Sequence, residues 1–318
     1  MSATEPAGGA AGPGEVPRRP ALSPSRAADF KQCPLLYRFR AIDRLPEVPG
    51  PAQARGTLVH AVLERLYALP APERLPAAAR ALVAPAWAEL CAAEPGLAAA
   101  LFGATAPEAA PPGVAGAAET AGSVGPAEVE QADAWLAGVG PLLDAYFALE
   151  DPRLLEPQAR EQLVEVELES GVLLRGYVDR IDADGGDYRV VDYKTGSAPG
   201  PAVEARALFQ MKFYALVLLL LRGRAPRELR LMYLTGPVVL HYVPDEEQLL
   251  RFARTLEAMW AAIRAAGTTG DFRPNPGPAC AWCSHRALCP AWDGVPPPYP
   301  GWPADVPAAG PPDRADEA

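Results

Sequence analysis

The residues best suited to chemistry lie at positions 176–196, GYVDRIDADGGDYRVVDYKTG. Two β-rich runs, 172–181 and 188–193, flank an Asp-Gly-Gly-Asp sequence that is typical of a hairpin turn. Asp179 lies in the first run, Asp192 lies near the end of the second, and Lys194 follows two residues later. Because side chains alternate across a strand, Asp192 and Lys194 share one face. Such a group is costly to bury, and it is typical of a site where carboxylates hold a hard divalent cation and the lysine acts beside it.

A second interpretation gives these charged side chains a structural role only. Asp179 with Arg180, and Asp192 with Lys194, could form salt bridges at the edge of an ordinary hairpin. The apolar neighbours of Asp192 instead indicate an interior strand, where such charges are costly to bury. Lysine is also rare: among 29 basic residues the chain has only Lys31, Lys194 and Lys212. The retention of a lysine at 194 suggests that arginine cannot replace it there.

A histidine could join these carboxylates. Residues 55–69, RGTLVHAVLERLYAL, have the apolar period of a helix, and His60 lies beside the apolar stripe. A lone histidine on such a helix is commonly a hydrogen-bonded structural residue. The acidic strands further along the chain favour a role as a metal ligand.

The cysteines predict a second, separate site. Cys280, Cys283 and Cys289 follow one another in a Pro-rich segment, and Cys33 lies near the start of the chain. In a reducing compartment such spacing indicates a metal or cluster site, and four thiolates suit either [4Fe–4S] or zinc. We expect Cys91, in an Ala-rich helix, to be a packing residue.

The pattern of elements predicts an α/β fold. The sequence predicts helices at 26–33, 55–69, 77–93, 132–149, 204–221 and 246–266, and strands at 163–169, 172–181, 188–193, 228–234 and 238–243. This order indicates a mixed central β-sheet flanked by helices.

Composition indicates one large domain. The chain has 318 residues, 49% hydrophobic, with 38 Pro and 28 Gly. We expect a disordered lead at 1–20, a domain at 21–290 with an Ala/Pro-rich insertion at about 94–130, and a disordered tail at 291–318.

The sequence has no signal peptide pattern and no apolar run of about 20 residues, so we expect a cytoplasmic protein without a membrane span. The net charge of −10 argues against a generally cationic nucleic-acid binder but leaves a local basic groove possible.

The ordered set of motifs resembles a known family. LSPSR…F…CP, GTLVH, GYVDRID, VVDYKTG, Q…Y on a helix and CxxC…C together resemble the PD-(D/E)XK nuclease superfamily. The resemblance is greatest to its RecB-like branch with an iron–sulfur cluster, which includes the AddB nuclease domain and CRISPR adaptation exonucleases. The match covers 22–67 and 163–290. It implies a restriction-endonuclease-like core with a Cys-clasped C-terminal segment.

The resemblance also implies roles. Asp179 and Asp192 would bind the metal with His60 and the carbonyl of Tyr193, and Lys194 would be the catalytic lysine. Gln210 and Tyr214 match the helix motif that contacts the substrate or supports the site. The extra Glu of the first strand could be Glu165 or Glu167, and the sequence does not decide between them. The family's Pro-Asp pair is Val178-Asp179 here. Four cysteines, Cys33, Cys280, Cys283 and Cys289, would hold a [4Fe–4S] cluster, with zinc as the alternative.

These expectations favour a Mg²⁺- or Mn²⁺-dependent DNA exonuclease that hydrolyses phosphodiester bonds in single strands or at ends during repair or recombination. A helicase or other repair protein is an expected partner, since the chain has no P-loop of its own. Alternatives are a non-catalytic iron–sulfur DNA-binding or assembly module and a zinc-stabilised protein-interaction domain. Candidate DNA contacts are Arg26, Lys31, Arg38, Arg40, Arg206, Lys212 and the basic cluster at 222–230. Cleavage polarity, strand preference and endo- or exonucleolytic action are not encoded in any motif.

Overall fold

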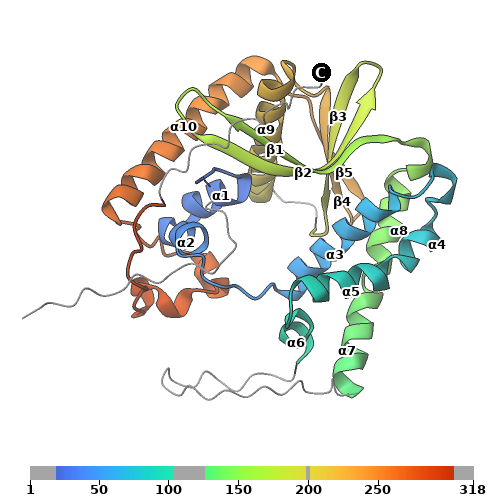
Figure 1. Ribbon diagram of the computed structural model, residues 1–318, viewed down its shortest axis with the longest axis horizontal. Coiled ribbons are helices and arrows are strands. Elements are labelled where there is room, and N and C mark those ends of the chain that lie inside the picture. Colours follow the sequence, from blue (N-terminus) through green and yellow to red (C-terminus); the bar gives the residue numbers. More distant parts are fainter. Residues whose placement is uncertain (1–18, 104–125, 198–200, 304–318) are drawn as a thin grey trace, which may run out of the picture.

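The computed structural model describes residues 19–103, 126–197 and 201–303. Its centre is a five-stranded sheet with strands in the order β1 to β5 (Figure 1). Strands β3 and β4 are parallel, and all other neighbours are antiparallel. The predicted mixed sheet flanked by helices is therefore confirmed. The strands are β1 (Pro157–Glu167), β2 (Leu173–Asp184), β3 (Asp187–Lys194), β4 (Glu228–Tyr233) and β5 (Val238–Tyr242).

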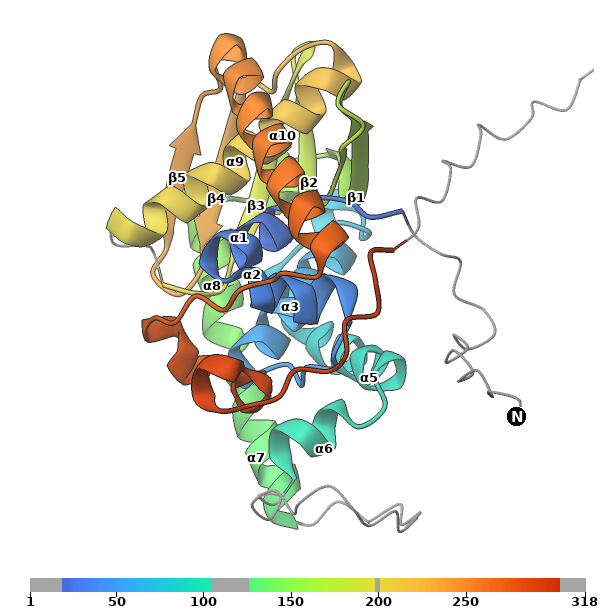
Figure 2. The same cartoon turned by 90° about the vertical axis from the view of Figure 1, so that its left-hand side faces the viewer.

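One face of the sheet packs against α9 and α10. Helix α9 (Pro201–Arg222) makes the crossover between the parallel strands β3 and β4, and α10 (Glu246–Thr269) packs on α9. Helix α1 (Pro24–Gln32) also contacts α9, as the two views show (Figures 1 and 2). Residues 213–219 of α9 are all buried, because the helix lies between the strands on one side and α1 and α10 on the other.

The other face packs against helices from the middle of the chain. Helix α3 (Pro51–Leu66) and helix α8 (Gly140–Leu149) bury Leu58, Val62 and Tyr146 in a core that also contains Val191 and Tyr193 of β3. Strand β3 is thus covered on both sides, which explains its run of buried residues. The charged end of β3 is therefore inside the molecule rather than on an exposed hairpin.

Local signals in the sequence explain several helix boundaries. Ser23 caps α1 by accepting a hydrogen bond from the backbone N–H of Arg26, and Pro24 occupies the first turn. Asp245 caps α10 in the same way, through the N–H of Gln248. That helix ends at Gly270, whose φ of 73° favours glycine. Cys33 lies at the break between α1 and α2 (Pro34–Tyr37), and a single π-helical turn, η1 (Arg38–Ile42), follows.

The middle of the chain has more helices than the sequence predicted. The expected helix at 77–93 is two helices, α4 (Pro76–Ala81) and α5 (Val83–Ala93). Pro85 lacks the N–H that a continuous helix would bond to residue 81, so the helix breaks there. The expected helix at 132–149 is divided at Gly138 and Gly140 into α7 (Pro126–Ala137) and α8. Helix α6 (Leu97–Phe102) lies within the proposed insertion, and residues 104–125 lie outside the described residues.

The C-terminal segment packs on the domain as far as residue 303. Three short 3₁₀ turns, η4 (Pro278–Trp282), η5 (Arg286–Leu288) and η6 (Pro290–Trp292), carry or adjoin the cysteines. Residues 293–303, the C-terminal strap, then run back along α10, where Trp302 packs on Trp260 with ring centroids 5.8 Å apart. The Tyr299 hydroxyl donates to the carbonyl of Gly267 at 2.6 Å. We expected 291–318 to lack structure, because a Pro-rich sequence has no periodicity. The strap departs from that expectation, and residues 304–318 are not described.

The described helices include none that is long and apolar enough to cross a membrane.

Candidate active site

The site lies where two strands of the sheet separate. The ladder between β2 and β3 ends at the pair Arg180–Val191, and the next residues are Asp179 and Asp192. Strand β3 stays paired with β4 as far as Lys194 and Tyr233. Beyond the ladder, the backbone N–H of Tyr193 donates to the Asp179 carboxylate at 2.7 Å. The separation leaves room for acidic side chains between the strand ends.

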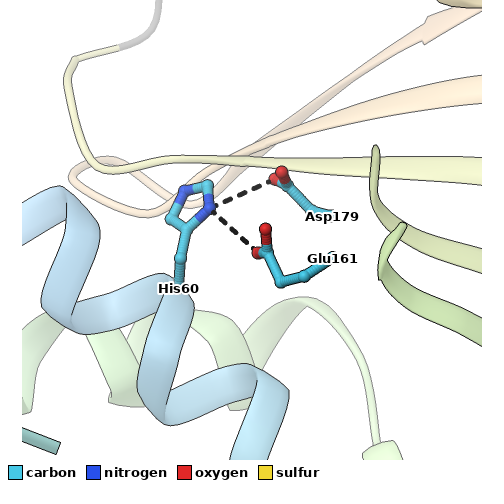
Figure 3. A group of neighbouring side chains, drawn as sticks. All are labelled: His60, Glu161 and Asp179. Carbon is cyan, nitrogen blue, oxygen red and sulfur yellow. Dashed lines mark ion pairs between the residues drawn. The ribbon is translucent and has the colours of Figure 1, made fainter. Parts of the chain in front are cut away.

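Three possible metal ligands meet at this point (Figure 3). They are His60 from α3, Glu161 from β1 and Asp179 from β2, and one ligand atom of each lies within 4.8 Å of the others. His60 Nδ1 is 3.5 Å from Asp179 Oδ2 and 3.7 Å from Glu161 Oε1. Carboxylate oxygens are the ligands that hard divalent cations prefer. The residues present therefore fit a divalent metal.

His60 also contacts the backbone of β3. Its Nε2 lies 3.0 Å from the carbonyl oxygen of Tyr193. Burial disfavours the charged imidazole, but Asp179 and Glu161 outweigh that effect and raise the pKa of His60 to about 10. The acidic groups thus stabilise positive charge at this position, which a bound divalent cation would also provide.

Asp192 and Lys194 form the second half of the site. Asp192 is 5% exposed, and its Oδ2 lies 2.5 Å from Lys194 Nζ. The amide of Gln210, on α9, donates to Asp192 Oδ1 at 2.8 Å. The pKa of Asp192 is raised to about 6, mainly by burial. The charge of Lys194 lowers this pKa, and the charge of Asp179 raises it. The lysine is thereby held as an ammonium beside Asp192, which raises the pKa of Lys194 against the effect of burial.

Gly176 makes room for Tyr214. Tyr214 follows Gln210 by one turn of α9 and is 8% exposed. A Cβ added at Gly176 would lie 2.7 Å from Cε1 of that ring. Real side chains do not approach so closely, so the glycine of GYVDRID permits α9 to approach β2 at the site.

A buried polar network lies on the opposite face of β2. Arg180 is 1% exposed and binds the Asp182 carboxylate through two hydrogen bonds of 2.9 and 3.0 Å. Its guanidinium also donates to the hydroxyls of Tyr67 and Tyr193, each at 2.6 Å. The Glu150 carboxylate accepts from both terminal nitrogens of Arg180, at 2.9 Å for the Nη2 contact. Arg180 therefore joins α3, β2, β3 and the end of α8 directly behind Asp179.

Comparison with known proteins identifies the family. Residues 21–290 match the sequence model of the PD-(D/E)XK nuclease superfamily. The chain belongs to this superfamily. The match spans every residue described above as part of the site. PD-(D/E)XK proteins are typically metal-dependent nucleases, which agrees with the ligand group His60, Glu161 and Asp179.

More specific relatives are distant. The Gene 69 protein of Mycobacterium phage D29 is 30% identical over 151 residues, which are 42% of this chain and 48% of that protein. The Gene 69 protein of Mycobacterium phage L5 is 28% identical over 129 residues, 38% of this chain and 41% of that protein. The chain thus spans less than half the length of these curated relatives. The solved structure described as the crystal structure of SSO0001 has a TM-score of 0.31 and 16% identity, and the match covers 52% of this chain and 75% of that one.

The structure brings most of the predicted PD-(D/E)XK site residues together. His60 contacts both Asp179 and the Tyr193 carbonyl, and Asp192, Lys194 and Gln210 form the adjoining group. The acidic residue from β1 is Glu161, which was not among the residues predicted from the sequence. Glu165 instead pairs with Arg175, and Glu167 pairs with Arg19 at 2.6 Å.

Glu161 was missed because the first strand begins earlier than predicted. The sequence placed its start at residue 163, whereas β1 starts at Pro157. In the pairing of β1 with β2, Arg160 lies opposite Arg180 and Gln162 lies opposite Val178. Glu161 therefore lies opposite Asp179. Its φ of 42° is in the left-handed region, which costs an ordinary residue about 1 kcal/mol or more. The strand register against GYVDRID is the signal that could have found it.

The three cysteines of the CxxC…C pattern and Cys33 line one cavity. Cys33, Cys280, Cys283 and Cys289 contribute to a cavity of about 230 Å³ between α2 and the C-terminal segment. Two backbone N–H groups, of Asn275 and Gly277, donate to sulfurs of Cys33 and Cys280 at 3.4 Å. No three of these sulfurs in the described chain lie within 4.8 Å of one another. A single zinc ion with Zn–S bonds of about 2.3 Å would need sulfurs about 3.8 Å apart.

The fifth cysteine lies apart from this cavity, whereas His285 lines it. Cys91 is on α5 and does not line the cysteine cavity. His285 is 4% exposed, and its Nε2 is 2.7 Å from Glu47 Oε1. Its ring also packs against Phe39 at 5.3 Å. His285 therefore contributes packing and an ion pair next to the cysteines.

Proposed function

We propose that the protein is a Mg²⁺-dependent deoxyribonuclease that hydrolyses phosphodiester bonds as an exonuclease. The observation that supports this most directly is the convergence of His60, Glu161 and Asp179 at 3.5–3.7 Å, with Lys194 beside Asp192 on the adjoining strand. An ordinary hairpin has no use for a half-buried ammonium, a buried carboxylate and three further possible ligands at one strand end. Mn²⁺ could replace Mg²⁺, since both take oxygen ligands.

The metal ligands would be His60, Glu161, Asp179 and Asp192, with the Tyr193 carbonyl. A bound divalent cation lowers the pKa of water and neutralises charge on the phosphate. Asp179 also accepts the Tyr193 N–H, which fixes the backbone that carries the carbonyl ligand. Gln210 orients Asp192 from the other side.

Lys194 would be the catalytic lysine. Its ammonium donates protons in hydrogen bonds and has no acceptor atom. Placed beside Asp192, it can orient the attacking water or donate to a non-bridging oxygen on which charge develops. Arginine has a longer, planar head group and does not reproduce this compact charge, which agrees with the retention of lysine in a chain that otherwise uses arginine.

The cysteine cavity supports a [4Fe–4S] cluster in this proposal. Cys33 comes from the end of α1, and Cys280, Cys283 and Cys289 come from the far end of the domain. The sulfurs line a single cavity, and N–H donors to sulfur favour thiolate ligands; zinc is the alternative occupant. A cluster here would link both ends of the domain, so its binding energy would contribute to folding.

Repair or recombination is the biological setting we propose, with single strands or DNA ends as substrate and a helicase or other repair protein as partner. The alternative is a non-catalytic iron–sulfur DNA-binding or assembly module. The intact set Asp179, Asp192 and Lys194 favours the enzyme, because a module that only binds DNA has no need of it.

An assay on linear and circular single-stranded DNA of equal length distinguishes an exonuclease, an endonuclease and a non-catalytic binding module. Purified anaerobically and assayed with Mg²⁺, the protein should degrade the linear form and spare the circle. Cleavage of both at the same rate would show an endonuclease. Binding without cleavage in Mg²⁺ or Mn²⁺ would support the non-catalytic module.

A further inference from the structure

A large basic cavity lies next to the site. It has a volume of about 890 Å³ and is bounded by α1, β2, α9 and the end of the C-terminal strap. Its lining contains one acidic residue, Asp29, and six arginines, namely Arg19, Arg26, Arg40, Arg44, Arg175 and Arg206. The chain has a net charge of −10, so a cluster of positive side chains is unusual in it and is suited to binding a polyanion.

The arginines crowd one another despite several acidic partners. Arg19 pairs with Glu167, Arg40 with Asp29 at 2.7 Å, and Arg175 with Glu165. Burial lowers the pKa of Arg26, and the charges of Arg175 and Arg44 lower it further. Arg44 also has a φ of 50°, in the left-handed region. A bound anion would relieve the repulsion among these side chains.

The cavity leads to the catalytic carboxylates along α9. Arg206, Gln210 and Tyr214 all line it, and their spacing of four residues places them in a row on one face of the helix. Gln210 is the residue that donates to Asp192. The row thus connects a basic side chain to the metal site within two helical turns.

Tyr177 marks the junction with a second cavity. It is 54% exposed and lines both the basic cavity and a cavity of about 530 Å³. The second cavity contains His60 and Glu161, and its other charged residue is Glu64. Tyr177 lies two residues before Asp179 on β2 and lines the cavity that contains His60 and Glu161. An exposed aromatic ring is therefore placed beside the metal ligands, between a basic and an acidic cavity.

We propose that the arginine-lined cavity binds the phosphate backbone of single-stranded DNA and that the ring of Tyr177 stacks on the base next to the scissile phosphate. This assignment rests on the proposed nuclease function and specifies its substrate. A base can stack on a protein ring only when it is unstacked from its neighbours, which favours a single strand over a duplex. The acidic cavity beyond Tyr177 disfavours a long strand on that side. The body of the substrate therefore lies among the arginines.

Binding measured without cleavage tests this assignment. Fluorescence anisotropy in EDTA would follow a labelled oligomer of about 12 thymidines over about 50–200 mM NaCl. The variants are Arg44→Gln with Arg206→Gln, the charge-preserving pair Arg44→Lys with Arg206→Lys, and Arg153→Gln as a control. All three arginines are exposed, and Arg153 does not line the cavity.

The salt dependence measures how many phosphates the protein neutralises. Removing one cation that neutralises a phosphate reduces the slope of log affinity against log salt by about 0.7 for single strands, so the double Gln variant should reduce it by about 1.4. The Lys pair and Arg153→Gln should keep the wild-type slope. A wild-type slope in the double Gln variant would overturn the assignment of the cavity.

Stacking is tested at Tyr177. Tyr177→Ala should weaken binding about 5- to 100-fold, and Tyr177→Phe should stay within about twofold because it keeps the ring. Equal losses in both variants, or a duplex that binds as tightly as the single strand, would overturn the stacking assignment.

The nuclease function and the DNA-binding site can be refuted independently of each other. Wild-type protein that binds as expected in EDTA but never cleaves would refute the nuclease function and leave the binding site intact. Cleavage that proceeds at the wild-type rate and salt dependence in all cavity variants would refute the binding site and leave the function intact.

Discussion

Replacing Arg180 by methionine should destabilise the domain strongly. The guanidinium lies at the centre of a network with Asp182, Glu150 and the hydroxyls of Tyr67 and Tyr193. Its side chain is 1% exposed, and those of Asp182 and Glu150 are 6% and 10% exposed. The variant leaves two carboxylates buried without their cation.

The size of the effect follows from this burial. Removing one partner of a buried ion pair costs about 3–5 kcal/mol, because the remaining charge is uncompensated. For a domain of this size, that loss lowers the unfolding midpoint by about 10 °C. Methionine approximates the length of the arginine stem, so little of the loss should come from a cavity. The additional change Glu150→Gln should restore part of the stability, because it removes one of the orphaned charges.

The ion pair between Arg180 and Glu150 also predicts how the loss of stability depends on pH. Burial raises the pKa of Glu150, but Arg180 outweighs burial and holds it below its ordinary value of 4.5. In the wild-type protein this carboxylate therefore contributes stability that is complete above pH 4.5 and is lost as the pH falls through the lower folded pKa. The difference between wild type and Arg180→Met should be largest near pH 7 and should shrink below about pH 4.5.

Thermal and urea unfolding from about pH 4 to pH 7 would measure this. Arg153→Met is the matched control, since Arg153 forms an exposed ion pair with Asp151 and its loss should leave the midpoint unchanged. A loss of less than about 1 kcal/mol in Arg180→Met, or a loss that is independent of pH, would refute the reasoning.

Three further variants test the site, its packing and the cysteine cavity. Glu161→Gln should raise the Mg²⁺ concentration for half-maximal cleavage by at least about 10-fold, because even residues that only orient metal ligands have effects of that size. Gly176→Ala should lower both stability and cleavage, by about 1–3 kcal/mol for stability, since its Cβ would lie 2.7 Å from the Tyr214 ring. Cys283→Ser should remove the visible absorption of the anaerobically purified protein and lower its solubility.

Each variant has a control in the same chain. Glu165→Gln removes a carboxylate from the same strand and should leave the Mg²⁺ dependence unchanged; an equal shift would remove Glu161 from the ligand set. Gly236→Ala adds a Cβ with nothing within 4 Å and should be tolerated, so equal losses would point to a general effect of alanine. Cys91→Ser should keep the chromophore, and a Cys283→Ser protein that also keeps it would contradict the cluster.

The fold was predictable to the extent that each element has its own periodicity. Strand β3 and helix α9 were expected within a few residues of their observed bounds, because each has a long apolar run with clear breaks. The helices around Pro85 and Gly138 were merged in the prediction, because a single breaker within an Ala-rich run changes the apolar pattern little. The C-terminal strap was missed for a different reason: Tyr299 and Trp302 pack on α10 through long-range contacts in extended chain, which leave no periodic signal.

The site was predictable where motif and strand coincide. Asp179, Asp192 and Lys194 follow from alternation along two strands of one hairpin. Glu161 depends on the register of a third strand, and a shift in that register moves a different glutamate to the site. The role of Arg180 was not foreseen either, because its partners come from several other elements that the sequence does not align.

The measurement that tests the central claim most directly is cleavage of end-labelled single-stranded DNA with and without Mg²⁺ by the wild type, Lys194→Met and Glu165→Gln. We expect Mg²⁺-dependent degradation by the wild type and by Glu165→Gln, none in EDTA, and none by a folded Lys194→Met protein. Cleavage by Lys194→Met at the wild-type rate, or cleavage by the wild type that persists in EDTA, would contradict the proposed active site.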